Sequence, residues 1–325
     1  MKFVPLIQER FRGVALAIGI TLLAYALANL IGFNAVLMAL ILGVVVGNVF
    51  TLPEGFSTGI KFSSGLVLEI SIALMAFGIN YGSLVKLGWQ SVVLVALSMT
   101  LILVFTKYLA KKMECPGTTG WLIGFGTAIC GSAAIAALAP KVVKNKADIG
   151  LALAVVNLYG LIGMIALPFI TGTWLSDVQN SVLIGASLHA VGNVAGAGFT
   201  LSETIGEMAV TIKLGRIALL TPALLLFGAS IKEKKDGVTQ KTKLPWYLVA
   251  FIVISILFSF ISLPNAFLDY TKQISNFLLA TAMAAIGLKV GLRSLLRAGK
   301  RGLIFGGIVF AFALLIISIL MLILF

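Results

Sequence analysis

Two apolar segments near the middle of the chain are each interrupted by glycine and a small polar residue. The first, WLIGFGTAICGSAAIAALAP, covers residues 121–140, and the second, SVLIGASLHAVGNVAGAGF, covers residues 181–199. Both contain the triplet LIG, and seven residues after its glycine both carry a further glycine followed by a small polar residue. These pairs are Gly131-Ser132 and Gly192-Asn193. Interrupted membrane segments in matching positions predict the binding site of a secondary transporter.

A break in a membrane helix exposes backbone groups that can bind an anion. The bilayer tolerates such breaks only inside protein or beside a watery cavity, because unsatisfied backbone groups are costly in lipid. The helix that restarts after each break presents free N–H groups and a partial positive charge. Two such ends entering from opposite faces would form an anion site near the midplane, although close packing of small residues is the alternative. The candidate substrate-binding residues are Gly131, Ser132, Ala133, Gly192 and Asn193.

A buried lysine adds positive charge to the second half of the chain. Lys213 lies in the apolar stretch AVTIKLGRIALL, where a charge costs at least about 2.5 kcal/mol. We expect Lys213 to neutralise an anionic substrate or to replace a coupling cation. Arg216, three residues later, shares its helix face, and snorkelling to the membrane surface is the alternative for both. Asn157, at a comparable depth after the first break, is the expected uncharged counterpart of Lys213.

Two further ionisable residues are candidates for ion coupling. His189, the single histidine, lies three residues before Gly192 and could carry a coupling proton, or it could be a neutral histidine bonded to a loose carbonyl. Glu69 lies in the apolar run GLVLEISIAL and has either a transport role or a packing role with a cationic partner. Neither broken segment contains Asp or Glu, which argues against a sodium/proton antiporter with a carboxylate pair.

The composition predicts an all-α, polytopic membrane protein. The chain has 325 residues, of which 60% are hydrophobic and 11% charged, and its mean hydropathy is +1.12. No short alternating segments of a barrel are present. The net charge of +13 comes from basic clusters between apolar spans, so we interpret it as membrane topology and not as nucleic-acid binding. Residues 1–325 are expected to form a single transmembrane transporter domain.

Several classes of chemistry are not expected. Cys115 and Cys130 imply neither a disulfide framework nor, with one histidine, a metal site, and Cys130 is expected to be a packing residue. The sequence has no phosphate-binding loop, no nucleotide-binding glycine pattern and no arrangement of nucleophile and base. We therefore expect no enzyme activity and no cofactor.

The basic clusters predict the topology. With a cytoplasmic N-terminus, the positive-inside rule places the large later clusters inside. The charged segment 231–243, IKEKKDGVTQKTK, is expected to be a cytoplasmic linker loop. Lys141, Lys144 and Lys146 follow the first broken segment and lie inside only if that segment re-enters. The predicted spans are 13–31, 35–50, 64–80, 88–110, 147–170, 205–230, 246–262, 272–289 and 302–324, with broken segments at 118–140 and 179–200.

The two halves of the chain also resemble each other. ALMAFGINYG, residues 73–82, is similar to AMAAIGLKVG, residues 282–291. The predicted topology runs these two spans in opposite directions, and it does the same for the helices that follow the two breaks. This pattern predicts inverted repeats.

These segments resemble a known family. The first broken segment, GASLHAVGNVAGAG, VTIKLGRIALLTP and AMAAIGLKVGLRSLLRAG together resemble the YeiH family of bacterial inner-membrane proteins, usually named sulfate exporters, over about residues 14–320. That family is grouped with the bile-acid:sodium symporters and cation/proton antiporters, whose broken helices cross. The resemblance therefore favours broken spanning helices, whereas the charges favour re-entry. The chain departs from the family pattern at Ala139 and Ala190, where many relatives have glutamate.

The sequence as a whole predicts a multi-pass transporter of the bacterial inner membrane. It would move a small anion (a sulfate, sulfonate or carboxylate) by alternating access, with a proton or sodium as the coupling ion. The alternatives are a sodium-coupled organic-anion symporter of the bile-acid type, with Glu69 and carbonyls of the broken helices as cation ligands, and a passive anion channel. Superfamily members are often dimers, so a homodimer stands beside a monomer as an alternative.

Overall fold

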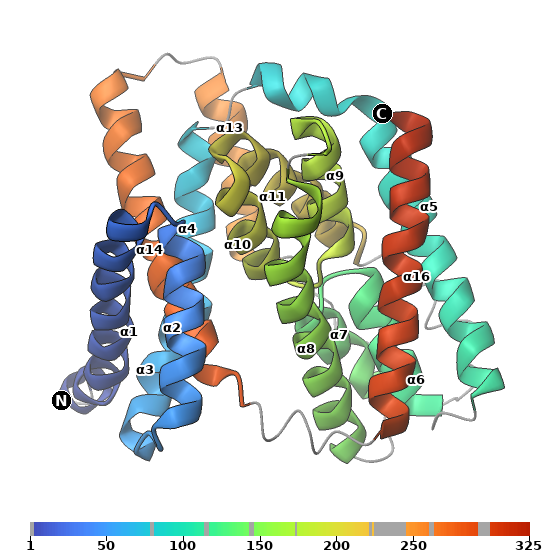
Figure 1. Ribbon diagram of the computed structural model, residues 1–325, viewed down its shortest axis with the longest axis horizontal. Helices are drawn as coiled ribbons and strands as arrows, with labels where there is room; N and C mark the ends of the chain where they lie inside the picture. Colours follow the sequence, from blue (N-terminus) through green and yellow to red (C-terminus); the bar gives the residue numbers. More distant parts are fainter. Residues whose placement is uncertain are drawn as a thin grey trace. The chain divides into compact units, whose positions relative to one another are not determined.

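The computed structural model describes residues 3–78, 81–113, 117–142, 146–172, 174–220, 223, 245–259, 263–291 and 300–325. Almost all of these residues are helical, and none of them lies in a strand, so the predicted all-α fold class is confirmed (Figure 1). The chain divides into two compact units. Unit 1 comprises Met1–Tyr81 and Pro245–Leu292, and unit 2 comprises Gly82–Leu244 and Arg293–Phe325. The expected linker loop 231–243 lies outside the described residues, as does Cys115.

The helices of each unit follow the predicted spans closely. Unit 1 contains α1 (Phe3–Ile31), α2 (Ala35–Val49), η1 (Glu54–Phe56), α3 (Ser57–Phe62), η2 (Ser63–Val67), α4 (Leu68–Met75), η3 (Ala76–Gly78), α13 (Trp246–Ser259) and α14 (Asn265–Lys289). Unit 2 contains α5 (Tyr81–Lys112), α6 (Gly117–Ala128), α7 (Ser132–Val142), α8 (Lys146–Thr171), α9 (Asp177–Ser187), α10 (Val191–Leu201), α11 (Glu203–Ala218) and α16 (Lys300–Leu324).

Five stretches of the described residues are long and apolar enough to cross a membrane. They are Arg10–Ile31, Glu54–Met75, Gly88–Lys112, Asp148–Thr171 and Lys300–Leu324. The helices on either side of the two breaks contain only 11 or 12 residues each. A helix rises about 1.5 Å per residue, so none of these four can cross a hydrocarbon core of about 30 Å alone. Together these helices make the chain a polytopic membrane protein.

Close backbone contact holds α2 against α14 in unit 1. A side chain at Gly43 would collide with the carbonyl oxygen of Ala284, and one at Gly287 would collide with that of Leu40. Asn48 Nδ2 then donates to the carbonyl oxygens of Val44, at 2.8 Å, and Val290, at 2.7 Å, which ties the end of α2 to the end of α14. Small residues at such crossings are typical of membrane helices, where close packing replaces the hydrophobic effect as the driving force.

The repeated segments of unit 1 run antiparallel, as predicted. Phe77, at the end of the first segment's helix, packs edge-on against Phe267, near the start of α14, with ring centroids 5.5 Å apart. At the other end of α14, Lys289 Nζ donates to Ser64 Oγ at 3.2 Å, before α4 begins. The helical residues 73–78 of the first segment and 282–289 of the second therefore run in opposite directions.

The first broken segment of unit 2 folds back on itself as a hairpin. The side chain of Ile135 packs against Gly126. A Cβ atom added at that glycine would lie 3.0 Å from Cγ1 of Ile135. In a straight helix these residues would be about 13 Å apart along the axis. Val156 of α8 packs on the same glycine, at 3.2 Å from the added Cβ. α6 and α7 thus both lie against the first half of α8.

The second broken segment is also a hairpin. Ser181, near the start of α9, donates from Oγ to the carbonyl oxygen of Ile205 at 3.4 Å. Gly198, near the end of α10, packs so closely on Gly206 that an added Cβ would lie 2.8 Å from its Cα. Since Ile205 and Gly206 both lie in the first turn of α11, the start of α9 and the end of α10 share one end of the unit.

The two hairpins enter unit 2 from opposite ends of α8 (Figure 1). α7 leads into the start of α8, whereas Leu201 at the end of α10 packs against Gly172 just beyond the end of α8. Both broken segments therefore re-enter, and neither is a broken spanning helix. Re-entry keeps the backbone of Lys141 and Lys146 at the end of the unit where α8 begins, and Lys144 lies outside the described residues. The start of α16, with Lys300 and Arg301, lies at the same end, because Gly302 packs on Leu151.

The close contact between α2 and α14 predicts that one methyl group added at Gly43 lowers the stability of the protein. Gly43→Ala should lower the stability of the protein by about 1–3 kcal/mol, because the added Cβ forces two backbones apart. The measurement is thermal unfolding of the purified protein in detergent. Gly19→Ala in α1 is the matched control, since nothing lies within 4 Å of a Cβ at that position. Equal melting temperatures for the two variants would contradict the close contact.

Candidate functional site

The tip of the first hairpin depends on one glycine. Gly131 has φ +68°, a left-handed conformation that residues with a side chain rarely adopt. Its N–H donates to the carbonyl oxygen of Gly126 at 2.8 Å and closes the last turn of α6. Its own carbonyl oxygen accepts from the N–H of Ile135 at 3.1 Å and begins α7. One residue thus ends one half-helix and starts the next.

The tip of the second hairpin is a short extended segment. Leu188 has φ −71° and ψ 150°, and Ala190 has φ −109° and ψ 154°, so the chain is extended on both sides of His189. α10 then begins with a hydrogen bond of 3.1 Å from the N–H of Val194 to the carbonyl oxygen of Ala190. The two tips touch, because a Cβ at Gly131 would lie 3.4 Å from the carbonyl group of His189.

Lys213 bridges the carboxyl-terminal ends of the two entering half-helices. Its ammonium group donates to the carbonyl oxygen of Ile129, 2.7 Å away, and to that of Leu188, 2.5 Å away. These carbonyl groups follow α6 and α9, where the helix ends and no further turn donates an N–H group to them. The side chain is 0% exposed. Lys213 therefore donates a hydrogen bond to one carbonyl group at each of the two tips.

Arg216 bonds to the same two helix ends from the next turn of α11. Its guanidinium group donates to the carbonyl oxygens of Thr127 and Ala128 at the end of α6, and to that of Ala186 at the end of α9. Arg216 is also 0% exposed. Two cations thus face the partial negative charge at the ends of α6 and α9. Snorkelling to the membrane surface is excluded for both side chains.

The two broken segments supply no acidic side chain to compensate the amino-terminal ends of α7 and α10. Segments 118–140 and 179–200 contain no Asp or Glu. No side chain caps α10, whose N-cap residue is Ala190. Ser132 and Ala133, the first residues of α7, are exposed, and Asn193 in the first turn of α10 is half-buried. The partial positive charge of two helix starts, with a hydroxyl and a carboxamide as added donors, can bind an anion.

His189 is buried in the second tip, where it lies against the end of α6 and against α16. Its Nε2 lies 3.2 Å from Thr127 Oγ1, and its ring lies 5.1 Å from that of Phe310. Its Nδ1 is buried and has no hydrogen-bond partner in the part of the chain that the structure describes. One ring nitrogen of His189 therefore has neither a donor nor an acceptor among the described residues.

The remaining predicted residues are Asn157, Glu69, Gly192 and Asn193. Asn157 is exposed on α8, and it does not join Lys213 at the helix ends. Glu69 belongs to unit 1, where its Oε2 accepts a hydrogen bond of 2.5 Å from Trp246 Nε1. Gly192 and Asn193 begin α10, and the carboxamide of Asn193 packs against Gly160 of α8. Unit 2 therefore brings together all five predicted backbone and side-chain donors, with Lys213, Arg216 and His189 beside them.

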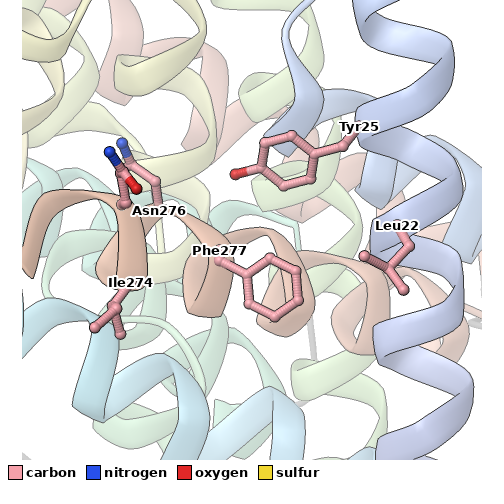
Figure 2. Close-up of a pocket in the computed structure, with 6 residues that line it drawn as sticks. Leu22, Tyr25, Ile274, Asn276 and Phe277 are labelled. Atoms are coloured by element: carbon pink, nitrogen blue, oxygen red, sulfur yellow. The ribbon is translucent and has the colours of Figure 1, made fainter. Parts of the chain in front are cut away.

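Two features of the structure, a bridging threonine and a pocket in unit 1, were not predicted from the sequence. Thr127 bonds to His189 through its side chain and to Arg216 through its carbonyl group, and a hydroxyl inside the apolar run 121–130 was the available signal. The second feature is a pocket of about 590 Å³ in unit 1. Figure 2 shows the Tyr25 hydroxyl pointing toward Asn276 across this pocket. It is lined by Leu22, Tyr25, Gln273, Ile274, Asn276 and Phe277.

Comparisons with known proteins give the family. Residues 12–306 match the family model described as Conserved hypothetical protein 698. The chain is 30% identical over 289 residues to the UPF0324 inner membrane protein YeiH of Escherichia coli K12, covering 86% of this chain and 83% of that one. It is 31% identical over 325 residues to the UPF0324 membrane protein YdhF of Lactococcus lactis, covering 95% and 98%.

One solved structure is also similar, at a lower level. It is the sodium proton antiporter MjNhaP1 from Methanocaldococcus jannaschii at pH 8. The sequence identity is 14%, the match covers 94% of this chain and 100% of that chain, and the TM-score is 0.30.

The hydrogen bonds of Lys213 predict a role in stability as well as charge balance. Lys213→Met keeps the shape of the side chain but leaves two buried carbonyl groups without a donor. The variant should lose about 3–5 kcal/mol of stability, measured by thermal unfolding in detergent. Lys107→Met, at an exposed position on α5, is the control and should unfold like the unchanged protein. Equal unfolding of both variants would contradict the bridging role.

Proposed function

We propose a function from two premises: the chain belongs to the family described as Conserved hypothetical protein 698, and the segments that contain the starts of α7 and α10 have no acidic residue. The function that fits best is secondary active transport of a small anion by alternating access. The substrate would bind the first residues of α7 and α10 in unit 2. Ser132 and Asn193 would add side-chain donors to the backbone N–H groups there.

One observation carries the proposal: the four half-helix ends at the tips are compensated unequally. The two carboxyl-terminal ends are bonded to buried Lys213 and Arg216. The two amino-terminal ends have neither an acidic side chain in their segments nor, at α10, a capping side chain. In a bilayer, uncompensated partial charges are costly. A bound anion is the simplest group that balances the partial positive charge of the two helix starts and can still dissociate from the site.

The division of the chain supports alternating access. Both hairpins, and with them the complete set of proposed donors, belong to unit 2. We propose that this unit moves during transport and that the remaining helices form the scaffold. The tips touch at Gly131 and His189 and are held by one pair of cations, so they would move together and keep the anion site intact.

The substrate classes follow from the donors. Backbone N–H groups, a hydroxyl and a carboxamide recognise oxygen acceptors, so sulfate, sulfonates and carboxylates fit the site. Lys213 and Arg216 would act through charge and not through contact, because both side chains bond to carbonyl groups.

Proton coupling is favoured over sodium coupling. His189 has one buried nitrogen without a partner and touches the first tip, so a proton gained there would change the charge beside the anion. A sodium site of the bile-acid type would need Glu69 and free carbonyl groups at the breaks. Glu69 is bonded to Trp246, and the carbonyl groups of Ile129 and Leu188 are bonded to Lys213.

A fixed carboxylate at the start of α7 should block the anion site. Ser132→Asp places a negative charge at the helix start, where it would take the place of the substrate. Wild-type protein should show higher thermal stability with at least one of sulfate, sulfite, taurine, sulfoacetate and acetate, and Ser132→Asp should lose that shift. Ser132→Asn, which has the same shape and no charge, is the matched control and should keep most of it. An undiminished shift in Ser132→Asp would contradict the site.

The proposed proton coupling predicts that a variant of His189 loses accumulation of the anion but keeps its passage across the membrane. In proteoliposomes, a pH gradient should drive accumulation of the stabilising anion by the wild-type protein. His189→Gln should still equilibrate the anion but should not accumulate it, because glutamine does not titrate. Accumulation by His189→Gln equal to wild type would rule out the histidine, and accumulation that follows a sodium gradient instead would favour the symporter. Currents independent of any coupling ion would indicate a channel.

A further inference from the structure

Four cationic side chains gather at one end of unit 1, whereas the residues proposed for transport belong to unit 2. They are Arg10 and Arg12 of α1, Lys61 of α3 and Lys289 of α14, and we call them the basic rim. All four are exposed. They come from three helices that meet only in the folded chain, so the basic rim is a product of tertiary structure.

The crossing of α1 and α3 places the two arginines. Gly13 and Gly59 lie in backbone contact, since a Cβ at Gly59 would be 2.7 Å from the Cα of Gly13. The guanidinium carbon of Arg10 lies 5.2 Å from the centre of the Phe62 ring. The guanidinium group of Arg12 lies over Gly55, 3.6 Å from where a Cβ would be.

The two lysines lie close together in the folded chain. Lys289 Nζ donates to Ser64 Oγ at 3.2 Å, and its charge interacts with that of Lys61. Among the described side chains, no ion pair is formed by any of the four cations, and the exposed carboxylate of Glu54 on η1 is not paired with them. Like charges held close together on a surface attract an anion that can bridge them.

Exposed apolar side chains border the same surface. Phe11 lies between the two arginines in sequence and is 69% exposed, and Val49 and Phe50 at the end of α2 are 67% and 61% exposed. The end of α2 is near the end of α14, because Asn48 donates to the carbonyl oxygen of Val290. Cations beside large exposed apolar groups match a ligand with a negative head and a hydrocarbon tail.

We propose that the basic rim binds the phosphate group of an anionic phospholipid. The phosphate bridges Lys61 and Lys289, with the arginines of α1 beside it, and the acyl chains lie against Phe11, Val49 and Phe50. Basic clusters where helices leave the membrane attract anionic lipids of the cytoplasmic leaflet, the side to which the positive-inside rule assigns this end. The bound lipid would hold α1, α3 and α14 together, a role that does not depend on the identity of the transported anion.

The test is thermal unfolding of the purified full chain in neutral detergent with added lipid. Dioleoylphosphatidylglycerol should raise the melting temperature, and dioleoylphosphatidylcholine should not. Lys61→Gln/Lys289→Gln should need at least about tenfold more phosphatidylglycerol for the same shift. Lys107→Gln/Lys111→Gln, which removes two exposed lysines of α5, is the matched control and should respond like wild type.

Three results would overturn the proposal. They are equal shifts with both lipids, an unchanged response of Lys61→Gln/Lys289→Gln, and an equal shift with millimolar inorganic phosphate, which would make the rim a site for free anions. If the double glutamine variant does not fold, Lys61→Arg/Lys289→Arg and wild type are compared by native mass spectrometry. Both should retain phosphatidylglycerol in preference to phosphatidylcholine, and loss of that preference would also overturn the proposal.

Discussion

The structure of unit 2 depends on how the bilayer treats an interrupted helix. Each hairpin tip ends one half-helix and starts another, so unpaired carbonyl and N–H groups meet where little water is available. Lys213 and Arg216 satisfy the carbonyl groups of both tips from a single helix, α11. The cost of burying two cations is offset only because each bonds to several carbonyl oxygens at a negative helix end. These two side chains therefore stabilise the contact between the tips.

Small residues make this arrangement possible. Gly131 adopts a backbone conformation that a side chain would oppose, and it lies within contact distance of the second tip. Gly160 leaves room on α8 for Asn193, and Gly198 lets α10 approach Gly206 of α11. The same chemistry holds α2 to α14 in unit 1 through Gly43 and Gly287. Glycine thus allows both the close packing of α2 on α14 and the close approach of the two tips.

The proposed anion site and the basic rim use positive charge in different ways. At the tips, the proposed ligand would face the partial positive charge of two helix starts. The charged groups of Lys213 and Arg216 donate their hydrogen bonds to carbonyl oxygens instead. At the basic rim, full charges are exposed and unpaired within the described side chains. A ligand that must be released suits the weaker, backbone-based site, whereas a lipid that stays in the membrane suits the rim.

The sequence alone determined the all-α membrane fold, the two breaks, the opposite directions of the repeated segments and the presence of two cations in one apolar span. These properties follow from local polarity, glycine positions and charge between spans. Only the tertiary structure decided that both segments re-enter, that Lys213 and Arg216 bond to helix ends, that Asn157 is exposed and that Glu69 pairs with Trp246. The reason is physical: a break shows that backbone groups are left unpaired, but the direction of the chain after the break and the partner of each carbonyl group depend on residues 25 to 89 positions away.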